Sequence, residues 1–146
     1  MIWLSGKGRR KMSKFIGGCL CGEIRYEVSG EPHMSYSCHC RDCQYITGGS
    51  PNNAIYIPQA ILTLKGCPSS YSSKSDSGSK TTRYFCGNCG TPLYGESELF
   101  PNSVVLKVGS LDDPTVFKST MNVWVSSAQP WHYINPDLPK YIKAPS

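Results

Sequence analysis

Three cysteines stand within six positions in residues 37–43, which read Ser-Cys-His-Cys-Arg-Asp-Cys. Side chains two residues apart in an extended segment leave the same face, so we expect Cys38 and Cys40 to project together while His39 points the other way. Cys43 then joins them after one tight turn. Three thiolates on one side of the backbone suit a tetrahedral metal ion such as zinc, and they leave its fourth position open for chemistry.

Two further cysteine pairs offer a second site: Cys19 and Cys21 form C-x-C, and Cys86 and Cys89 form C-x-x-C. Spacing alone allows two ways of dividing these seven cysteines into metal sites. The first joins two C-x-x-C pairs, Cys40, Cys43, Cys86 and Cys89. The second is a closed group of Cys19, Cys21, Cys86 and Cys89 beside an open group of Cys38, Cys40 and Cys43. The 42 residues between Cys43 and Cys86 exceed the usual separation of about 15 to 20, which favours the second division. A closed site would contribute directly to folding.

The composition bounds the class of protein. At 146 residues the chain fits one domain. Its N-terminus lacks a secretory signal, and no apolar run approaches the roughly 18 residues that span a bilayer. We therefore expect a cytoplasmic protein with no membrane partner. In a reducing compartment, eight cysteines point to metal binding or catalysis rather than to disulfides. Cys67 lies outside every motif and is expected to be a free thiol.

The net charge of +5 comes from the N-terminal end of the chain. The first fourteen residues hold five basic side chains and no acid, and without them the balance is zero. We predict that residues 1–13 are a basic tail, either disordered or a mis-called start with Met12 as the natural one, and that 14–146 form a single domain. Because this domain has no basic stripe interleaved with stacking aromatic residues, a nucleic-acid partner is not expected.

The hydrophobic pattern indicates an all-β fold with two sheets sharing a core. Ile24, Tyr26 and Val28 alternate with polar residues, which is typical of a strand with one buried face. The next strand carries Tyr36 and Cys38 on one face and delivers the open cysteine group at its end. Extended segments are also predicted at 81–86, 104–108 and 117–125, a hairpin at 54–57 and 61–65, and a serine-rich loop at 69–79. Helix is limited to short turns near 42–46 and 126–131.

These motifs, in this order, resemble the glutathione-dependent formaldehyde-activating enzyme family, which includes centromere protein V. The resemblance rests on residues 18–22, 37–43, 83–93 and 109–114. It implies a β-tent of two packed antiparallel sheets stapled by zinc, with little helix. It also implies two zinc ions per chain, a structural one on Cys19, Cys21, Cys86 and Cys89 and a catalytic one on Cys38, Cys40 and Cys43.

The resemblance further implies a zinc-dependent carbon–sulfur lyase whose partner is a small thiol such as glutathione. Addition of that thiol to formaldehyde gives S-hydroxymethylglutathione. The carboxylates of glutathione require cations beside the site, and we take Arg25 and Arg41 as the candidates. The alternative is a non-catalytic zinc-stapled module that binds a protein or nucleic acid. The two readings differ in whether the protein has a thiol-dependent activity.

Three other polar residues are given structural roles. His39 faces away from its cysteine neighbours in an extended segment, so we expect it to pack behind them rather than to act in acid–base chemistry. His132 lies between two aromatic residues and is also expected to pack. Asp112 and Asp113 precede a proline and are assigned to a turn.

Overall fold

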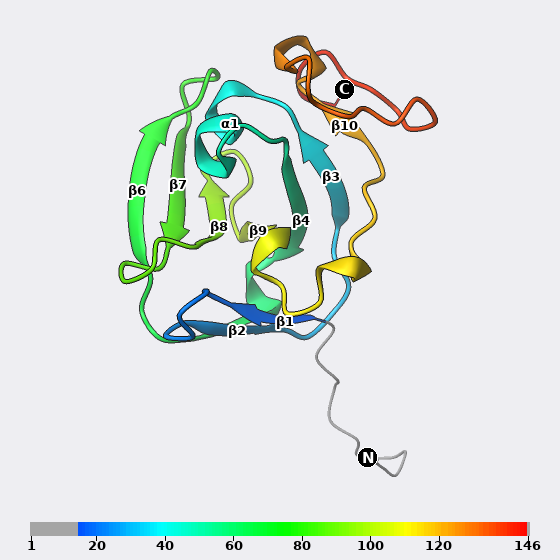
Figure 1. Cartoon of the computed structure of the whole chain (residues 1–146). Helices are drawn as coiled ribbons and strands as arrows, with labels where there is room; N and C mark the ends of the chain where they lie inside the picture. The colour runs from blue at the N-terminus through cyan, green and yellow to red at the C-terminus, as the bar shows by residue number, and fades with distance from the viewer. Residues whose placement is uncertain (1–14, 146) are drawn as a thin grey trace.

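The computed structural model describes residues 15–145 and shows two β-sheets (Figure 1). The predicted tail at 1–13 lies outside the described residues. The smaller sheet is ordered β1-β2-β5 and consists of β1 (Phe15–Gly18), β2 (Arg25–Val28) and β5 (Leu62–Lys65). The larger sheet contains β3 (Met34–Cys38), β4 (Asn52–Pro58), β6 (Ser69–Lys74), β7 (Lys80–Phe85), β8 (Pro92–Ser97), β9 (Ser103–Lys107) and β10 (Asn122–Val123).

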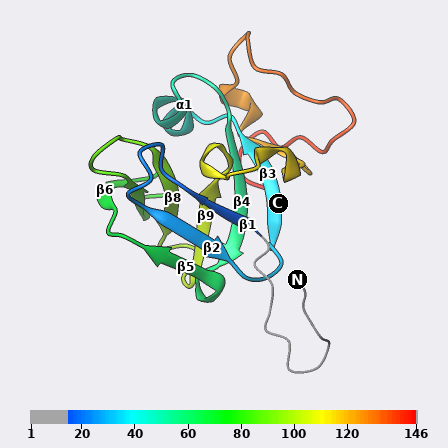
Figure 2. The ribbon, with the colours of Figure 1, turned by 60° about the horizontal axis from the view of Figure 1, so that its bottom comes forward.

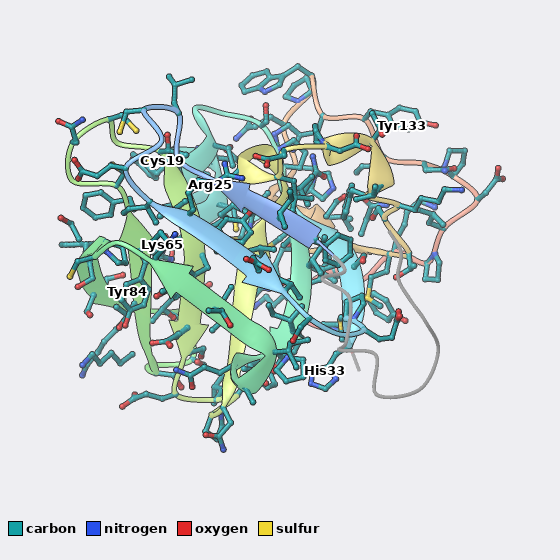
Figure 3. The ribbon with its side chains drawn as sticks, turned by 90° about the horizontal axis from the view of Figure 1, so that it is seen from below. Cys19, Arg25, His33, Lys65, Tyr84 and Tyr133 are labelled. Carbon is teal, nitrogen blue, oxygen red and sulfur yellow. The ribbon has the colours of Figure 1, made fainter. Side chains whose placement is uncertain are left out.

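The larger sheet has the order β10-β3-β4-β9-β8-β7-β6. The smaller sheet lies across its strands, as Figures 2 and 3 show from two directions. The all-β class and the pair of sheets are as predicted. Among the named strands the pairing is antiparallel, except that the two-residue β10 runs parallel to β3 at one edge.

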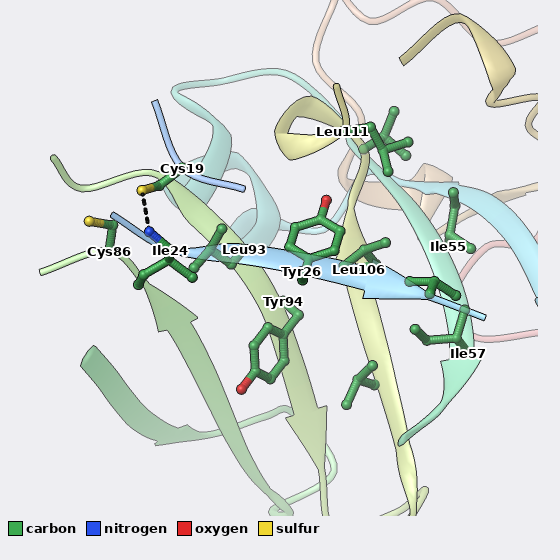
Figure 4. Close-up of a cluster of buried hydrophobic side chains, with 13 residues drawn as sticks. Cys19, Ile24, Tyr26, Ile55, Ile57, Cys86, Leu93, Tyr94, Leu106 and Leu111 are labelled. Atoms are coloured by element: carbon green, nitrogen blue, oxygen red, sulfur yellow. Dashed lines mark hydrogen bonds between the residues drawn. The ribbon is translucent and has the colours of Figure 1, made fainter. Parts of the chain in front are cut away.

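The core lies between the two sheets and is built on the alternation predicted for β2. Ile24, Tyr26 and Val28 are all buried and meet residues of β4, β8 and β9 (Figure 4). Tyr26 is a large apolar side chain with a polar end, and its hydroxyl lies 2.6 Å from Ser110 Oγ. Ser110 Oγ in turn donates to the Lys107 carbonyl at 2.8 Å. The tyrosine therefore buries its ring without leaving its hydroxyl unpaired.

Tyr26→Phe is expected to lower the free energy of unfolding by about 1 kcal/mol at neutral pH, because one buried hydrogen bond is lost. Burial raises the pKa of Tyr26 from 10 to about 12. Above about pH 10 Tyr26 ionises in the unfolded chain but not in the folded one, so the wild type loses stability. The difference in the free energy of unfolding between the wild type and Tyr26→Phe therefore becomes smaller. Urea unfolding at about pH 7 and pH 11 measures both effects. Tyr71→Phe, on the exposed β6, serves as the control, and a gap that widens with pH would contradict the prediction.

The predicted hairpin at 54–57 and 61–65 is wrong. Both segments are strands, but β4 pairs with β3 and β9, whereas β5 pairs with β2 in the other sheet. The 3₁₀ turn η1 (Gln59–Ile61) between them carries the chain from one sheet to the other. An apolar run predicts a strand but does not specify its partner.

Two other assignments need correction. The serine-rich segment 69–79 was predicted to be a loop, yet β6 occupies its first half and pairs with β7. The strand predicted at 117–125 is reduced to the two residues of β10, which follow the 3₁₀ turn η3 (Pro114–Val116). Most of that segment joins elements instead of extending the sheet.

Helix is scarce in the described chain. The α-helix α1 (Arg41–Thr47) ends at Gly48, whose φ of +79° is the left-handed conformation that glycine adopts readily. The remaining 3₁₀ turns are η2 (Val108–Ser110) and η4 (Val125–Ser127). Between residues 15 and 145, no helix has the length and apolar character needed to cross a membrane.

Candidate metal centres and active site

The open cysteine group forms where β3 ends and α1 begins. Cys38 is the last residue of β3, Cys40 is the N-cap of α1, and Cys43 lies in its first turn. The three Sγ atoms lie within 4.8 Å of one another. The backbone N–H of Cys43 donates to Cys40 Sγ at 3.4 Å, which fixes that sulfur at the start of the helix. The local sequence thus brings three sulfurs together without help from distant segments.

The protonation of these thiols is coupled. Hydrogen bonds from the thiols of Cys38 and Cys43 lower the pKa of Cys40 to about 2. The hydrogen bond to Cys40 raises the pKa of Cys38 in turn. A divalent ion would favour all three as thiolates and release the remaining protons.

The closed cysteine group joins the loop after β1 to the turn between β7 and β8. The Sγ atoms of Cys19, Cys21, Cys86 and Cys89 lie within 4.8 Å of one another. The Sγ atoms of Cys19 and Cys21 are 3.6 Å apart, and those of Cys21 and Cys86 are 3.8 Å apart. Tetrahedral zinc with bonds of about 2.3 Å places its sulfur ligands about 3.8 Å apart. The donor set and its spacing therefore fit zinc.

Backbone and side-chain amides surround these four sulfurs. Ile24 N–H donates to Cys19 Sγ at 3.2 Å (Figure 4). Asn88 donates to Cys86 Sγ from its backbone at 3.3 Å and to Cys21 Sγ from its side chain at 3.3 Å. The turn closes at Gly90, which has a φ of +82°. Such donors stabilise thiolate charge and orient metal ligands.

The grouping follows the second of the two divisions that the spacing allowed. Cys40 and Cys43 lie with Cys38, and Cys86 and Cys89 lie with the N-terminal pair. All eight cysteines are free thiols in the structure, and Cys67 is exposed outside both groups. Which ion occupies each group, and whether the trio acts in catalysis, remain predictions.

A lysine that was not among the predicted site residues interacts electrostatically with the open group. Lys107 ends β9, pairs in register with Ala54 of β4 and is partly buried. Burial lowers its pKa, and the negative charges of Cys43, Cys38 and Cys40 act in the opposite direction. Arg83 of β7 is a second cation nearby, and it pairs with Asp42 of α1 at 3.7 Å. A single lysine at the end of an apolar strand is typical of a solvated strand end, so its interaction with the cysteines could not be predicted from the sequence.

The model of the glutathione-dependent formaldehyde-activating enzyme family matches residues 14–127. The protein belongs to this family. An uncharacterized lyase of Schizosaccharomyces pombe is 33% identical over 102 residues, which cover 66% of this chain and 71% of that protein.

Among solved structures, the crystal structure of a Rhodobacter sphaeroides protein superposes with a TM-score of 0.55 at 17% identity. The match covers 86% of this chain and 98% of the other. At this identity the likeness concerns the fold alone. It agrees with the two-sheet architecture expected for a member of the formaldehyde-activating enzyme family.

The two arginines predicted to orient glutathione in this family member have protein partners. Arg25 donates to Asp112 Oδ1 at 2.9 Å and also pairs with Asp112 Oδ2, so it joins β2 to the segment after η2. Arg41 lies 4.9 Å above the Tyr45 ring and donates to Gln44 Oε1 at 2.5 Å. Ligand binding by either arginine remains a prediction.

The two aspartates that were assigned to a turn have different partners. Asp112 forms the ion pair with Arg25, whereas Asp113 caps η3, as the turn assignment expects.

His39 is fully buried behind the cysteines, as predicted. Its Nε2 lies 2.8 Å from Asn122 Oδ1 of β10, and its Nδ1 lies 2.9 Å from Nδ1 of His132. The backbone N–H of His39 donates to the Val123 carbonyl at 3.0 Å. His132 also contacts the Gly49 carbonyl through Nε2 at 2.8 Å. The C-terminal part of the chain thus holds the cysteine segment through His39.

Proposed function

We propose that the protein is a zinc-dependent carbon–sulfur lyase that makes and breaks the bond between formaldehyde and a small thiol such as glutathione. The observation that carries the proposal is the trio of Cys38, Cys40 and Cys43, which no fourth cysteine, histidine or carboxylate of residues 15–145 completes. Membership of the formaldehyde-activating enzyme family and the similarity to a lyase support this function.

The two cysteine groups suit different tasks. Four thiolates close a tetrahedral site, as in structural zinc centres, whereas three leave one position for a reactant. Zinc held by Cys38, Cys40 and Cys43 would supply a Lewis acid that lowers the pKa of an incoming thiol. The chain supplies the fixed trio, the Cys43 amide that orients Cys40 Sγ, and Lys107, which interacts electrostatically with the three cysteines.

The reaction requires no change in oxidation state overall. The thiol sulfur bonds to the carbonyl carbon, the electron pair of the C=O π bond moves to oxygen, and the proton lost from the thiol ends on that oxygen. The product is a hydroxymethyl thioether. In the reverse direction its C–S bond breaks and returns thiol and formaldehyde. The protein mainly brings two reactants together, which offsets an entropic cost of several kcal/mol.

Magnetisation-transfer NMR on mixtures of formaldehyde and glutathione tests this function. We expect catalytic amounts of zinc-loaded protein to accelerate exchange between the free thiol and its hydroxymethyl adduct. Chelation should abolish the acceleration, and zinc should restore it. The control is free zinc at the same concentration. A rate equal to this control, with both metal sites filled, would contradict the lyase proposal and favour a binding module.

A further inference from the structure

A hollow of about 410 Å³ is lined by three neighbouring strands of the larger sheet. Three of its lining residues form a row across these strands, because Ser37 of β3 pairs in register with Asn53 of β4 and with Asn122 of β10. Consecutive side chains of a strand point to opposite faces, so this row faces away from Cys38. No cysteine lines the hollow, which is therefore separate from both cysteine groups, and its volume is in the range of small-molecule sites.

The strongest sign of a ligand is the side-chain amide of Asn122. The residue is only 3% exposed, and its Oδ1 lies 2.8 Å from Nε2 of the buried His39. Its Nδ2 has no hydrogen-bond partner within residues 15–145. Among these residues every fully enclosed side-chain nitrogen or oxygen has a partner, so Nδ2 must be reached from the hollow that Asn122 lines. A buried residue that keeps one donor free for a hollow suits a ligand with an acceptor there.

Two further asparagines present amide groups in the same way. Asn53 Oδ1 lies 2.8 Å from Ser37 Oγ, and Asn135 Oδ1 accepts the backbone N–H of Asp137 at 2.9 Å. Both asparagines line the hollow. In all three asparagines the oxygen is occupied by the protein, so the amide nitrogen is the part left for a ligand. The hollow thus offers three amide donors from three different segments of the chain.

The other groups around the hollow are neutral or aromatic. The hydroxyls of Ser50 and Tyr133 can both donate and accept, and the rings of Phe117 and Tyr133 add flat apolar surface. Tyr133 lies on the C-terminal segment, and its side chain is largely exposed (Figure 3). No lysine, arginine, histidine, aspartate or glutamate is among the described residues that line the hollow. Because an ion removed from water needs an opposite charge nearby, this composition favours a neutral ligand.

We propose that this hollow binds a neutral ligand with several hydroxyl groups, such as a monosaccharide. Hydroxyl oxygens of the ligand accept from the amides, and its hydroxyl protons are donated to the serine and tyrosine oxygens. The C–H face of a sugar ring is weakly positive and packs on the negative face of an aromatic ring, which is the role of Phe117 and Tyr133. The site is independent of the lyase proposal, because such a ligand contains no thiol and no cysteine lines the hollow.

NMR titration of the isotope-labelled, zinc-loaded full chain with D-glucose, D-galactose and myo-inositol tests the site, with no thiol or formaldehyde present. We expect at least one of these probes to shift the side-chain amide signals of Asn122 saturably, with a Kd of roughly 1 mM or below, typical of small polar ligands. The side-chain amide of Asn88 donates to Cys21 Sγ, so it should not shift and is the internal control. If no probe gives saturable shifts up to roughly 50 mM, well above that Kd, the proposal is overturned.

Charged analogues test the preference for a neutral ligand. D-glucuronate and D-glucosamine place a negative and a positive charge on a sugar ring of the same size. Each should bind at least roughly tenfold more weakly than the best neutral probe, because the hollow has no charged group to pair with it. Equal or tighter binding of either analogue would contradict the proposed ligand class.

Two substitutions identify the groups that hold the ligand. Asn122→Asp keeps an oxygen for His39 and replaces the free amide nitrogen by an acceptor, so affinity should fall by roughly tenfold or more. Tyr133→Ala removes an exposed ring and is expected to weaken binding by about 3- to 10-fold with the fold unchanged. Tyr71→Ala, at an exposed tyrosine outside the hollow, is the matched control and should bind as the wild type does. Wild-type affinity in Tyr133→Ala, or in an Asn122→Asp protein that keeps the native spectrum, would place the ligand elsewhere and overturn the proposal.

Discussion

Cys86→Ser is expected to leave the protein without a cooperative unfolding transition at 25 °C. Cys86 is fully buried, and its sulfur accepts N–H bonds from Asn88 and Cys89. The closed group fastens the loop after β1 to the β7–β8 turn, and serine is a poor substitute for a thiolate ligand. Structural zinc contributes about 10–16 kcal/mol of apparent binding energy in small metal-dependent domains, as much as the whole stability of a typical domain, about 5–15 kcal/mol.

Urea unfolding followed by circular dichroism, together with metal analysis, measures this effect. Cys67→Ser is the matched control, since Cys67 is exposed and belongs to neither group. It should unfold at the wild-type midpoint with its zinc content unchanged. A Cys86→Ser protein that unfolds cooperatively near that midpoint would show that the closed group does not hold the fold together.

The cysteine groups could be predicted because their chemistry is local and restrictive. Cys38, Cys40 and Cys43 meet within one strand end and one helical turn, so the chain geometry alone brings them together. The closed group depends on contacts across 65 residues, from Cys21 to Cys86. Its composition followed from the exclusion of a poorly spaced alternative and from the resemblance to a family. Four sulfurs have few ways to form one site.

Strands with one buried face were predicted more reliably than strands at an edge. β2 shows alternation because one of its faces meets the core. β6 is almost entirely exposed and consists largely of serines, so its residues show no hydrophobic period and look like a loop. Its strand conformation comes from pairing with β7, for example between Tyr71 and Arg83. Such pairing is a tertiary property that the segment itself does not encode.

The polar contacts of the candidate site were the least predictable part. His39 and His132 are 93 positions apart and meet because β10 runs beside β3. Lys107 approaches the trio because β9 pairs with β4, whose first residue is opposite Cys38. Both of these interactions depend on the order of the strands in the sheet, which the hydrophobic pattern does not specify. Arg25 and Arg41 were predicted as the cations for the carboxylates of glutathione, and both have partners within the protein.

Cys40→Ser is expected to remove one equivalent of zinc and reduce formaldehyde–thiol exchange by roughly 100-fold or more. Lewis-acid assistance is worth several kcal/mol, and each 1.4 kcal/mol is about tenfold in rate. The fold should remain, because the segment is held without the ion. The backbone of β3 pairs with β4 and β10, and the buried His39 contacts Asn122 and His132. We expect the free energy of unfolding to fall by no more than about 2 kcal/mol.

The contrast between the two serine variants tests the division of labour between the cysteine groups. Metal content, the urea midpoint and the exchange rate are measured on Cys40→Ser, Cys86→Ser and Cys67→Ser prepared alike. Cys40→Ser should resemble Cys67→Ser in stability and differ from it in zinc content and exchange rate. If Cys40→Ser loses the fold as completely as Cys86→Ser, the trio is a second structural site. If it keeps the exchange rate, the reaction takes place elsewhere. A folded Cys40→Ser protein that carries one zinc and has lost exchange activity is the result that assigns folding to four sulfurs and the reaction to three.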